Sequence, residues 1–179
     1  MADRLLVDVI TRPGWVRLPA GAPTPGGRMA VMGQVVATAE RVVRAPADVV
    51  RDALADYVTT RPAVLPEQYS EYRVDDGGRG AGTRVHWRLQ ATSKRVREQD
   101  VVVTAGPDGA LVESDANSSM VTTWTVTPAD AGASTVRART TWNGAGGIGG
   151  FFERAFAPKG LARIHQALLE RLEHTVTTG

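Results

Sequence analysis

Three side chains of the sequence have the chemistry to move a proton next to a bound molecule: His165, Tyr69 and Glu98. Imidazole, phenol and carboxyl groups are the common general acids and bases of enzymes. His165 lies beside an apolar stripe formed by Leu161, Ile164, Leu168 and Leu172, where a lone histidine often serves as a hydrogen-bonded packing residue. Both roles of His165 therefore stay open, and no catalytic residue is assigned from the sequence.

Other reactive patterns are absent or incomplete. The chain has no cysteine, which excludes disulfides, thiolate metal sites and a cysteine nucleophile. His86, His165 and His174 lack the spacing of zinc ligands, so we expect neither a metal nor another cofactor. Residues 144–149 match GxGxxG, but no second parallel strand of a dinucleotide-binding fold fits in the chain that follows. We interpret this glycine-rich stretch as a hinge.

The elements that must position these side chains are mostly strands. Alternating apolar and polar residues predict strands at 35–43, 69–74, 83–91, 96–104, 111–118, 120–127 and 135–142. A helix should begin at Pro46, and Pro62 and Pro66 limit a second one to residues 63–68. A long helical pattern closes the chain, and Pro158 and Gly160 should kink or break it. An antiparallel sheet with one apolar face needs a cover, and only this last helix is long enough.

Composition narrows the class of protein. The chain has 179 residues, of which 42% are hydrophobic, and its length predicts about one domain. No apolar run is long enough to span a membrane, so stable membrane insertion is not expected. The net charge is +2, and residues 1–33, with four arginines and two aspartates, account for all of it. The neutral remainder lacks the basic surface that nucleic-acid binding requires.

The chain therefore divides into two parts. Residues 1–33 are rich in proline and glycine and are expected to form a poorly ordered extension, whereas residues 34–177 form a single domain. The 19 arginines against two lysines are typical of a GC-rich bacterial genome. The absence of cysteine fits a reducing compartment, and we expect a cytoplasmic protein that is a monomer or a homodimer.

The order of these elements resembles the helix-grip fold of the START/Bet v 1-like (SRPBCC) superfamily, which includes polyketide cyclases/dehydrases and lipid-transport proteins. The resemblance covers residues 35–176 and is carried by RAPADVV at 44–50, GTRV at 82–85, TWTVTP at 123–128 and the segment 141–172. It implies an α+β fold in which a curved antiparallel sheet wraps around a long C-terminal helix, with two short helices after the first strand. It also implies a pocket for an apolar or aromatic molecule.

Aromatic residues on the apolar strand faces support such a pocket, although each of them could also fill the core. A cavity of roughly 300 Å³ or more would hold a ligand. The residues predicted to line it are Tyr57, Tyr69, Val85, Trp87, Leu89, Glu98, Asp100, Trp124, Val136, Trp142, Phe152, Phe156, Ile164, His165 and Leu168.

The inward face of the strand at 96–104 depends on its register. A two- or four-residue loop near Ser93 places Glu98 and Asp100 beside Leu89 and Trp87, whereas a three-residue loop places Arg97 and Gln99 there. Glu113 and Asp115 carry the same ambiguity. Either register turns polar groups inward, where they would orient a bound molecule, unless this end of the sheet is open to water.

Three functions compete. The leading hypothesis is a non-catalytic protein that binds a small hydrophobic or aromatic molecule, lipid or polyketide-like, between the sheet and the last helix. The alternative is an enzyme of the cyclase/dehydrase type that uses the same cavity. The third is a protein-interaction module with a filled core.

Overall fold

The computed structural model describes residues 33–92, 95–144 and 147–178, without the side chains of residues 91, 92, 95, 131 and 147–156. The predictions for the N-terminal extension, apart from Gly33, and for the side chains of Phe152 and Phe156 lie outside the described residues.

The architecture is one antiparallel sheet with a long helix across it. The strands are β1 (Gln34–Val43), β2 (Tyr69–Asp76), β3 (Arg84–Thr92), β4 (Arg95–Ala105), β5 (Leu111–Asp115), β6 (Val121–Pro128) and β7 (Ser134–Asn143). The helices are α1 (Ala47–Ala55), α2 (Thr60–Val64) and α3 (Gly147–Thr178), with short 3-10 turns at Pro107–Gly109 and Asp130–Gly132. The seven strands follow the order β1-β7-β6-β5-β4-β3-β2. The predicted helix-grip fold is therefore confirmed.

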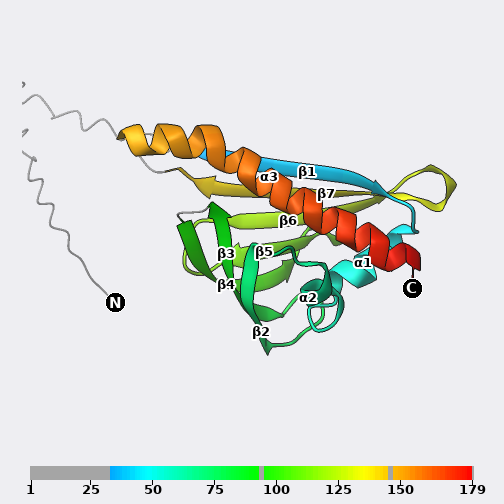
Figure 1. Cartoon of the computed structure of the whole chain (residues 1–179). Helices are drawn as coiled ribbons and strands as arrows, with labels where there is room; N and C mark the ends of the chain where they lie inside the picture. Colours follow the sequence, from blue (N-terminus) through cyan, green and yellow to red (C-terminus); the bar gives the residue numbers. More distant parts are fainter. Residues whose placement is uncertain (1–32, 93–94, 145–146, 179) are drawn as a thin grey trace, which may run out of the picture.

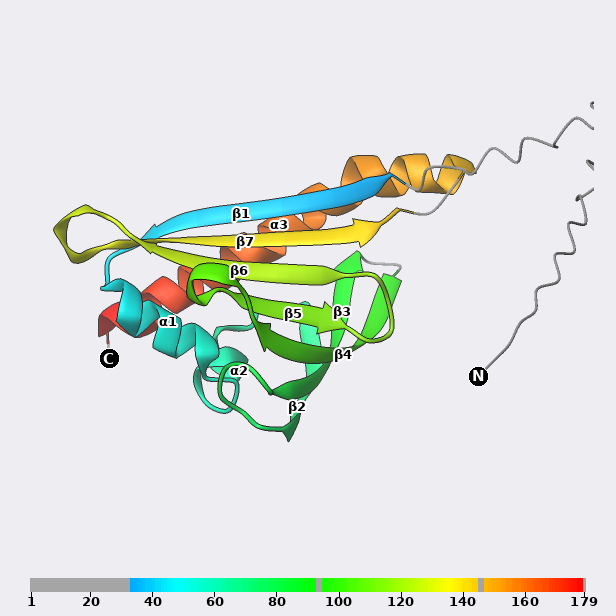
Figure 2. The same cartoon turned by 180° about the vertical axis from the view of Figure 1, so that it is seen from behind.

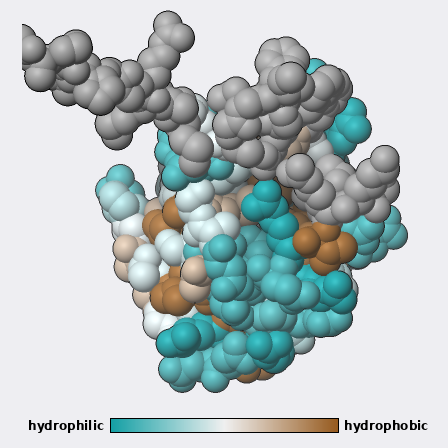
Figure 3. All heavy atoms as spheres, turned by 90° about the vertical axis from the view of Figure 1, so that its left-hand side faces the viewer, coloured by the Kyte–Doolittle hydropathy of each residue, from teal (hydrophilic) through white to brown (hydrophobic). Residues whose placement is uncertain are grey.

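The sheet separates a covered inner face from an outer face. α3 crosses the inner face and packs against β1 and β3, while α1 and α2 close one end (Figure 1). The view from behind shows the outer face of β1, β7 and β6 (Figure 2). On the side shown in Figure 3, hydrophobic residues appear as separate small areas on a mostly hydrophilic surface. None of the described helices has the length and hydropathy of a membrane span.

The link between α1 and α2 differs from the sequence-based prediction. α2 begins at Thr60 rather than at residue 63, because the Asp56 carboxylate accepts hydrogen bonds from the amides of Val58, Thr59 and Thr60. These bonds supply the N-terminal partners that a helix start needs. Pro62 consequently falls in the first turn, where a missing N–H costs little. The shift brings Arg61 into the helix and into the core.

The last helix is also longer than predicted. α3 is continuous from Gly147 to Thr178, with Pro158 inside it, so of the two predicted outcomes at Pro158 and Gly160, a kink or a break, the break does not occur. Its C-terminal half buries Leu161, Ile164 and Leu168 against the sheet. This burial outweighs the local cost of proline, about 3 kcal/mol in a helix interior.

Two hydrophobic clusters fill the space between sheet and helix. One joins α1, the ends of β1 and β7 that lie near α1, and the C-terminal part of α3, and it includes Trp124, Val136 and Leu168. The other lies under β3 and β4 and includes Trp87, Trp142 and Ile164. The candidate site consists of polar side chains between and beside these clusters.

Candidate functional site

A small cavity lies under the inner face of β3, β4 and β5. Its volume is about 20 Å³, which suffices for a water molecule but not for a drug-sized ligand. This cavity is smaller than the predicted one of 300 Å³ or more. The residues that line this central cavity are Tyr69, Trp87, Leu89, Gln99, Val101, Glu113, Asp115, Met120, Thr122, Leu161 and His165.

Two tyrosines hold the Trp87 ring in place. Tyr69 meets Trp87 edge-on with ring centroids 5.7 Å apart, and Tyr72 stacks on it at 6.1 Å. Residues three apart on a regular strand point to opposite faces. The register of β2 shifts between Ser70 and Arg73, and Glu71 has a φ of 53°. This bulge turns both tyrosines toward Trp87.

A second bulge sets the register of β4. β3 ends at Thr92 and β4 begins at Arg95, and these two residues pair with each other. A register shift between Gln90 and Thr92 then changes which residues pair along the rest of the two strands. Gln99 therefore pairs with Trp87 and lies buried, and the Trp87 Nε1 donates a 2.9 Å hydrogen bond to its Oε1. The loop between β3 and β4 is thus the two-residue loop of the first prediction, but beyond the bulge the two strands pair in the register that was expected for a three-residue loop.

The placement of Glu98 and Asp100 in the cavity is accordingly wrong. Their side chains are 53% and 49% exposed on the outer face, where both contact His86. Glu98, named above as a candidate acid or base, therefore does not face the central cavity. Arg97 is the cross-strand partner of Leu89.

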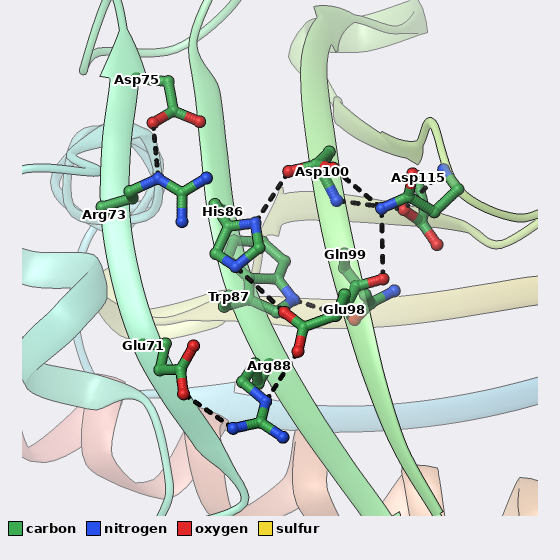
Figure 4. A network of polar contacts seen from close by, with 11 residues as sticks. Glu71, Arg73, Asp75, His86, Trp87, Arg88, Glu98, Gln99, Asp100 and Asp115 are labelled. Atoms are coloured by element: carbon green, nitrogen blue, oxygen red, sulfur yellow. Dashed lines mark hydrogen bonds and ion pairs between the residues drawn. The ribbon is translucent and has the colours of Figure 1, made fainter.

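The outer face of β2, β3 and β4 carries a network of ion pairs around His86 (Figure 4). His86 lies 2.8 Å from Asp100 through Nδ1 and 3.2 Å from Glu98 through Nε2. Ligand atoms of Glu71, His86 and Glu98 lie within 4.8 Å of one another, a spacing that a metal ion would accept. Arg88, however, contacts Glu71 at 2.7 Å and Glu98 at 2.8 Å, so a guanidinium already neutralises both carboxylates.

A buried ion pair lies on the inner face beside the central cavity. Arg61 in α2 is 1% exposed, and its Nη2 contacts the carboxylate of Glu113 in β5. Tyr57 donates a 2.7 Å hydrogen bond to the same carboxylate. Burial alone lowers the pKa of Arg61, but Glu113 and Tyr57 raise it overall. Burial, reinforced by Glu113, raises the pKa of Tyr57, so Arg61 is charged and Tyr57 neutral at pH 7.

Trp124 in β6 and His165 in α3 lie next to this group of Arg61, Glu113 and Tyr57. The Arg61 guanidinium lies 4.7 Å from the centroid of the Trp124 ring, and the centroid of the His165 ring lies 5.4 Å from the same point. Burial lowers the pKa of His165 to about 4; the charge of Glu113 opposes this shift, and that of Arg61 adds to it. His165 is therefore a neutral imidazole at pH 7.

Three nitrogen atoms of these side chains have no hydrogen-bond partner among the described residues: Arg61 Nη1, Trp124 Nε1 and His165 Nδ1. Their side chains are 1%, 3% and 2% exposed. Buried polar atoms without a partner are uncommon because each costs roughly 1–3 kcal/mol. Of the three side chains, His165 lines the central cavity, where its Nδ1 could accept a hydrogen bond from an oxygen-bearing molecule or donate one to it.

The predicted site residues other than Glu98, Asp100, Phe152 and Phe156 fall into three groups. Tyr69, Trp87, Leu89 and His165 line the central cavity. Tyr57, Val85, Trp142 and Ile164 are buried around it, and Trp124, Val136 and Leu168 belong to the neighbouring cluster. Contact of any of these residues with a ligand stays a prediction.

Sequence reasoning missed Arg61 and the cavity-lining residues Val101, Met120, Thr122 and Leu161, and left Gln99, Glu113 and Asp115 undecided. Arg61 lies just before the short helix predicted at 63–68, where an arginine gives no sign of burial. Glu113 lies two residues after Leu111 on a short strand and therefore shares its face, and that spacing was the available signal.

A family comparison agrees with this architecture. The model of the family described as polyketide cyclase / dehydrase and lipid transport matches residues 34–177. No curated protein sequence matches the chain.

Solved structures give the same fold. The chain is 48% identical to the KanY protein, whose solution structure it matches with a TM-score of 0.74 over 82% of this chain and 99% of that one. It is similar to the ZhuI aromatase/cyclase of a Streptomyces species, with 15% identity, a TM-score of 0.64, and 81% and 94% of the two chains covered. Norcoclaurine synthase of Thalictrum flavum matches with 14% identity and a TM-score of 0.61 over 81% and 95% of the chains. At these low identities the last two support the fold alone.

Proposed function

Because the chain belongs to the polyketide cyclase/dehydrase and lipid-transport family, we propose that it binds a small, largely apolar molecule that carries a hydrogen-bond-accepting oxygen. The molecule, polyketide-like or lipid-like, occupies the space between the sheet and α3. Trp87, Leu89 and Leu161 provide the apolar walls. Arg61 and His165 face its oxygen.

One observation carries this proposal: the buried Nδ1 of His165, which lines the central cavity, and the buried Nη1 of Arg61, whose ion-pair partner Glu113 lines it, have no hydrogen-bond partner among the described residues. A filled protein core leaves few polar atoms unsatisfied, whereas a binding site keeps them for its ligand. Arg61 is already held by Glu113 through Nη2, so its orientation is fixed before a ligand arrives. Such preorganisation lowers the entropic cost of binding.

The volume of about 20 Å³ requires that the ligand enlarge the central cavity. Met120 and Leu161 line this cavity, and unbranched or flexible apolar side chains adjust at small cost. The ligand-free protein is then a closed state, and binding shifts the population toward an open one.

A thermal-shift screen of aromatic polyketide-like compounds and fatty acids tests the proposal. A ligand at a hundredfold excess over Kd stabilises the folded state by about 2.7 kcal/mol. We expect Leu161→Trp, which fills the cavity, to abolish the ligand-induced shift. Val36→Trp adds the same side chain on the exposed face of β1 and should leave that shift unchanged. No stabilisation by any compound favours an interaction module with a filled core.

An enzyme of the cyclase/dehydrase type is the second candidate, and the charge state of the site favours it. A charged Arg61 stabilises an enolate oxygen, and neutral His165 accepts a proton at Nδ1. Tyr69 stays protonated because burial raises its pKa. Turnover of a poly-β-ketone substrate that is lost in His165→Gln, while binding persists, identifies this activity; equal turnover in both proteins excludes it for His165.

We place the protein in the cytoplasm as a monomer or homodimer, without nucleic-acid or membrane partners. The absence of cysteine supports the cytoplasmic location, and the zero net charge of the domain supports the absence of a nucleic-acid partner. Size-exclusion chromatography with light scattering, with and without added DNA, tests the assembly.

A further inference from the structure

A second cavity is lined by Trp124, and it shares no lining residue with the central cavity. It has a volume of about 140 Å³ and lies between α1, the turn before β5, and β6. Its lining residues are Arg51, Asp52, Leu54, Ala55, Gly109, Leu111, Trp124 and Val126. A cavity of about 150 Å³ accommodates a molecule of the size of benzene.

The lining combines an apolar floor with a fixed cation. Leu54 and Trp124 are 2% and 3% exposed and form the floor together with Leu111 and Val126. Arg51 reaches across the cavity and donates a 2.8 Å hydrogen bond from Nη2 to the carbonyl oxygen of Val126. That bond fixes the guanidinium at the wall and leaves further N–H groups for a ligand.

The charges at the rim favour an anion. Asp52 lies 3.2 Å from Arg79, and both side chains are largely exposed, so the negative charge of Asp52 is partly offset. The Arg51 guanidinium contacts no carboxylate among the described residues, and its hydrogen bond goes to the neutral carbonyl group of Val126. The Trp124 Nε1, buried and without a partner, belongs to the same wall.

From this combination we infer that the cavity between α1 and β6 is a second binding site, for a small aromatic carboxylate. The ring rests on Leu54, Leu111 and Val126, and the carboxylate pairs with Arg51. This site is independent of the proposed function, because it requires no ligand in the central cavity. A ligand in this second cavity would also affect the central cavity, because it would contact Trp124, whose ring in turn contacts Arg61 and His165.

The test is a titration of the full chain with benzoate, followed by ¹H–¹⁵N NMR. We expect saturable shifts of the Trp124 indole N–H and of the amides of residues 51–55 and 109–111. Arg51→Gln should weaken benzoate binding by about fivefold or more, because a charge-assisted contact is lost. Arg44→Gln removes an exposed arginine just before α1 and should change the affinity less than twofold.

Two further comparisons test whether the charge of the ligand and the size of the cavity matter for binding. Benzyl alcohol has the ring without the charge and should bind more weakly than benzoate. Ala55→Met narrows the cavity and should also weaken binding. Linear shifts without saturation, equal affinity in Arg51→Gln, or equal affinity for benzyl alcohol would overturn the inference. Shifts centred on Trp87 and Leu89 instead would assign benzoate to the central cavity and likewise overturn the second site.

Discussion

The indole nitrogen of Trp87 donates a 2.9 Å hydrogen bond to the side-chain oxygen of Gln99, its cross-strand neighbour, inside the sheet. Gln99 in turn lies 3.2 Å from the sulfur of Met120 through Nε2. This chain of contacts fixes one wall of the central cavity. It exists because the bulge in β3 turns Gln99 inward and Glu98 outward.

Substitution of the two neighbours tests this register. Gln99→Leu leaves the buried Trp87 Nε1 without an acceptor and should reduce the free energy of unfolding by about 1–3 kcal/mol. Glu98→Gln changes an exposed surface ion pair and should cost less than about 1 kcal/mol. Urea unfolding measures both. A larger cost for Glu98→Gln than for Gln99→Leu would mean that the other register holds.

The Arg61–Glu113 pair should behave as a coupled buried ion pair. Arg61→Met leaves the Glu113 carboxylate in the core with the Tyr57 hydroxyl as its remaining described partner, and should reduce the free energy of unfolding by about 3–5 kcal/mol. Arg61→Met combined with Glu113→Leu removes both charges and should be less destabilising than the sum of the single changes. Chemical denaturation of Arg61→Met, Glu113→Leu and the double variant, each compared with wild type, gives the double-mutant cycle.

The exposed pair Arg137–Glu40 serves as the control for this cycle. Its side chains are 57% and 45% exposed, so Arg137→Gln should cost less than about 1 kcal/mol. Additive costs in the Arg61 and Glu113 cycle, as at two unrelated sites, would argue against the buried pair.

His165 makes stability depend on pH. Its folded pKa of about 4 lies below the value near 6.5 of an unfolded histidine, so the unfolded chain binds the proton more readily. The stability that neutral His165 contributes is complete above pH 6.5 and declines as the pH falls toward 4. The slope reaches about 1.4 kcal/mol per pH unit.

Denaturation of His165→Gln at pH 7, 6 and 5 checks this slope. The difference in free energy of unfolding between wild type and variant should shrink as the pH falls. Val36→Ala, which removes no titratable group from an exposed position of β1, should keep a constant difference from wild type. A constant difference for His165→Gln as well would show that the pKa of His165 is the same in the folded and unfolded states.

Pro158 interrupts the hydrogen bonding of α3 and should therefore lower its stability. Pro158→Ala restores an N–H donor and should raise the melting temperature by several degrees, corresponding to about 1–3 kcal/mol. Lys159→Ala, at the exposed neighbouring position, should change it little. A lower melting temperature in Pro158→Ala would mean that the helix requires the proline geometry.

The fold was predictable because its elements carry strong periodic patterns. The alternation of Val85, Trp87 and Leu89 with Arg84, His86 and Arg88 places the strand and its buried face correctly. All three tryptophans predicted to face inward are buried, at 5%, 3% and 4% exposure for Trp87, Trp124 and Trp142. Periodicity thus identifies the covered face without tertiary information.

The site was predictable only in part, because two bulges and one helix start define it. The bulge at Glu71 allows Tyr69 and Tyr72 to share a face, and the bulge before Thr92 decides between Glu98 and Gln99. A bulge changes the face by one residue and leaves no periodic signal. Arg61 was missed because the Asp56 cap, which starts α2 before Pro62, depends on the folded geometry of that loop.

The crystal structure of the protein saturated with 2-naphthol, a planar aromatic alcohol, tests the proposed binding site most directly. We predict the naphthol ring between Trp87 and Leu161, displaced side chains of Met120 or Leu161, and the oxygen within hydrogen-bond distance of Arg61 Nη1 or His165 Nδ1. Electron density that shows the interior still closed at about 20 Å³, with 2-naphthol on the surface or absent, would contradict the account.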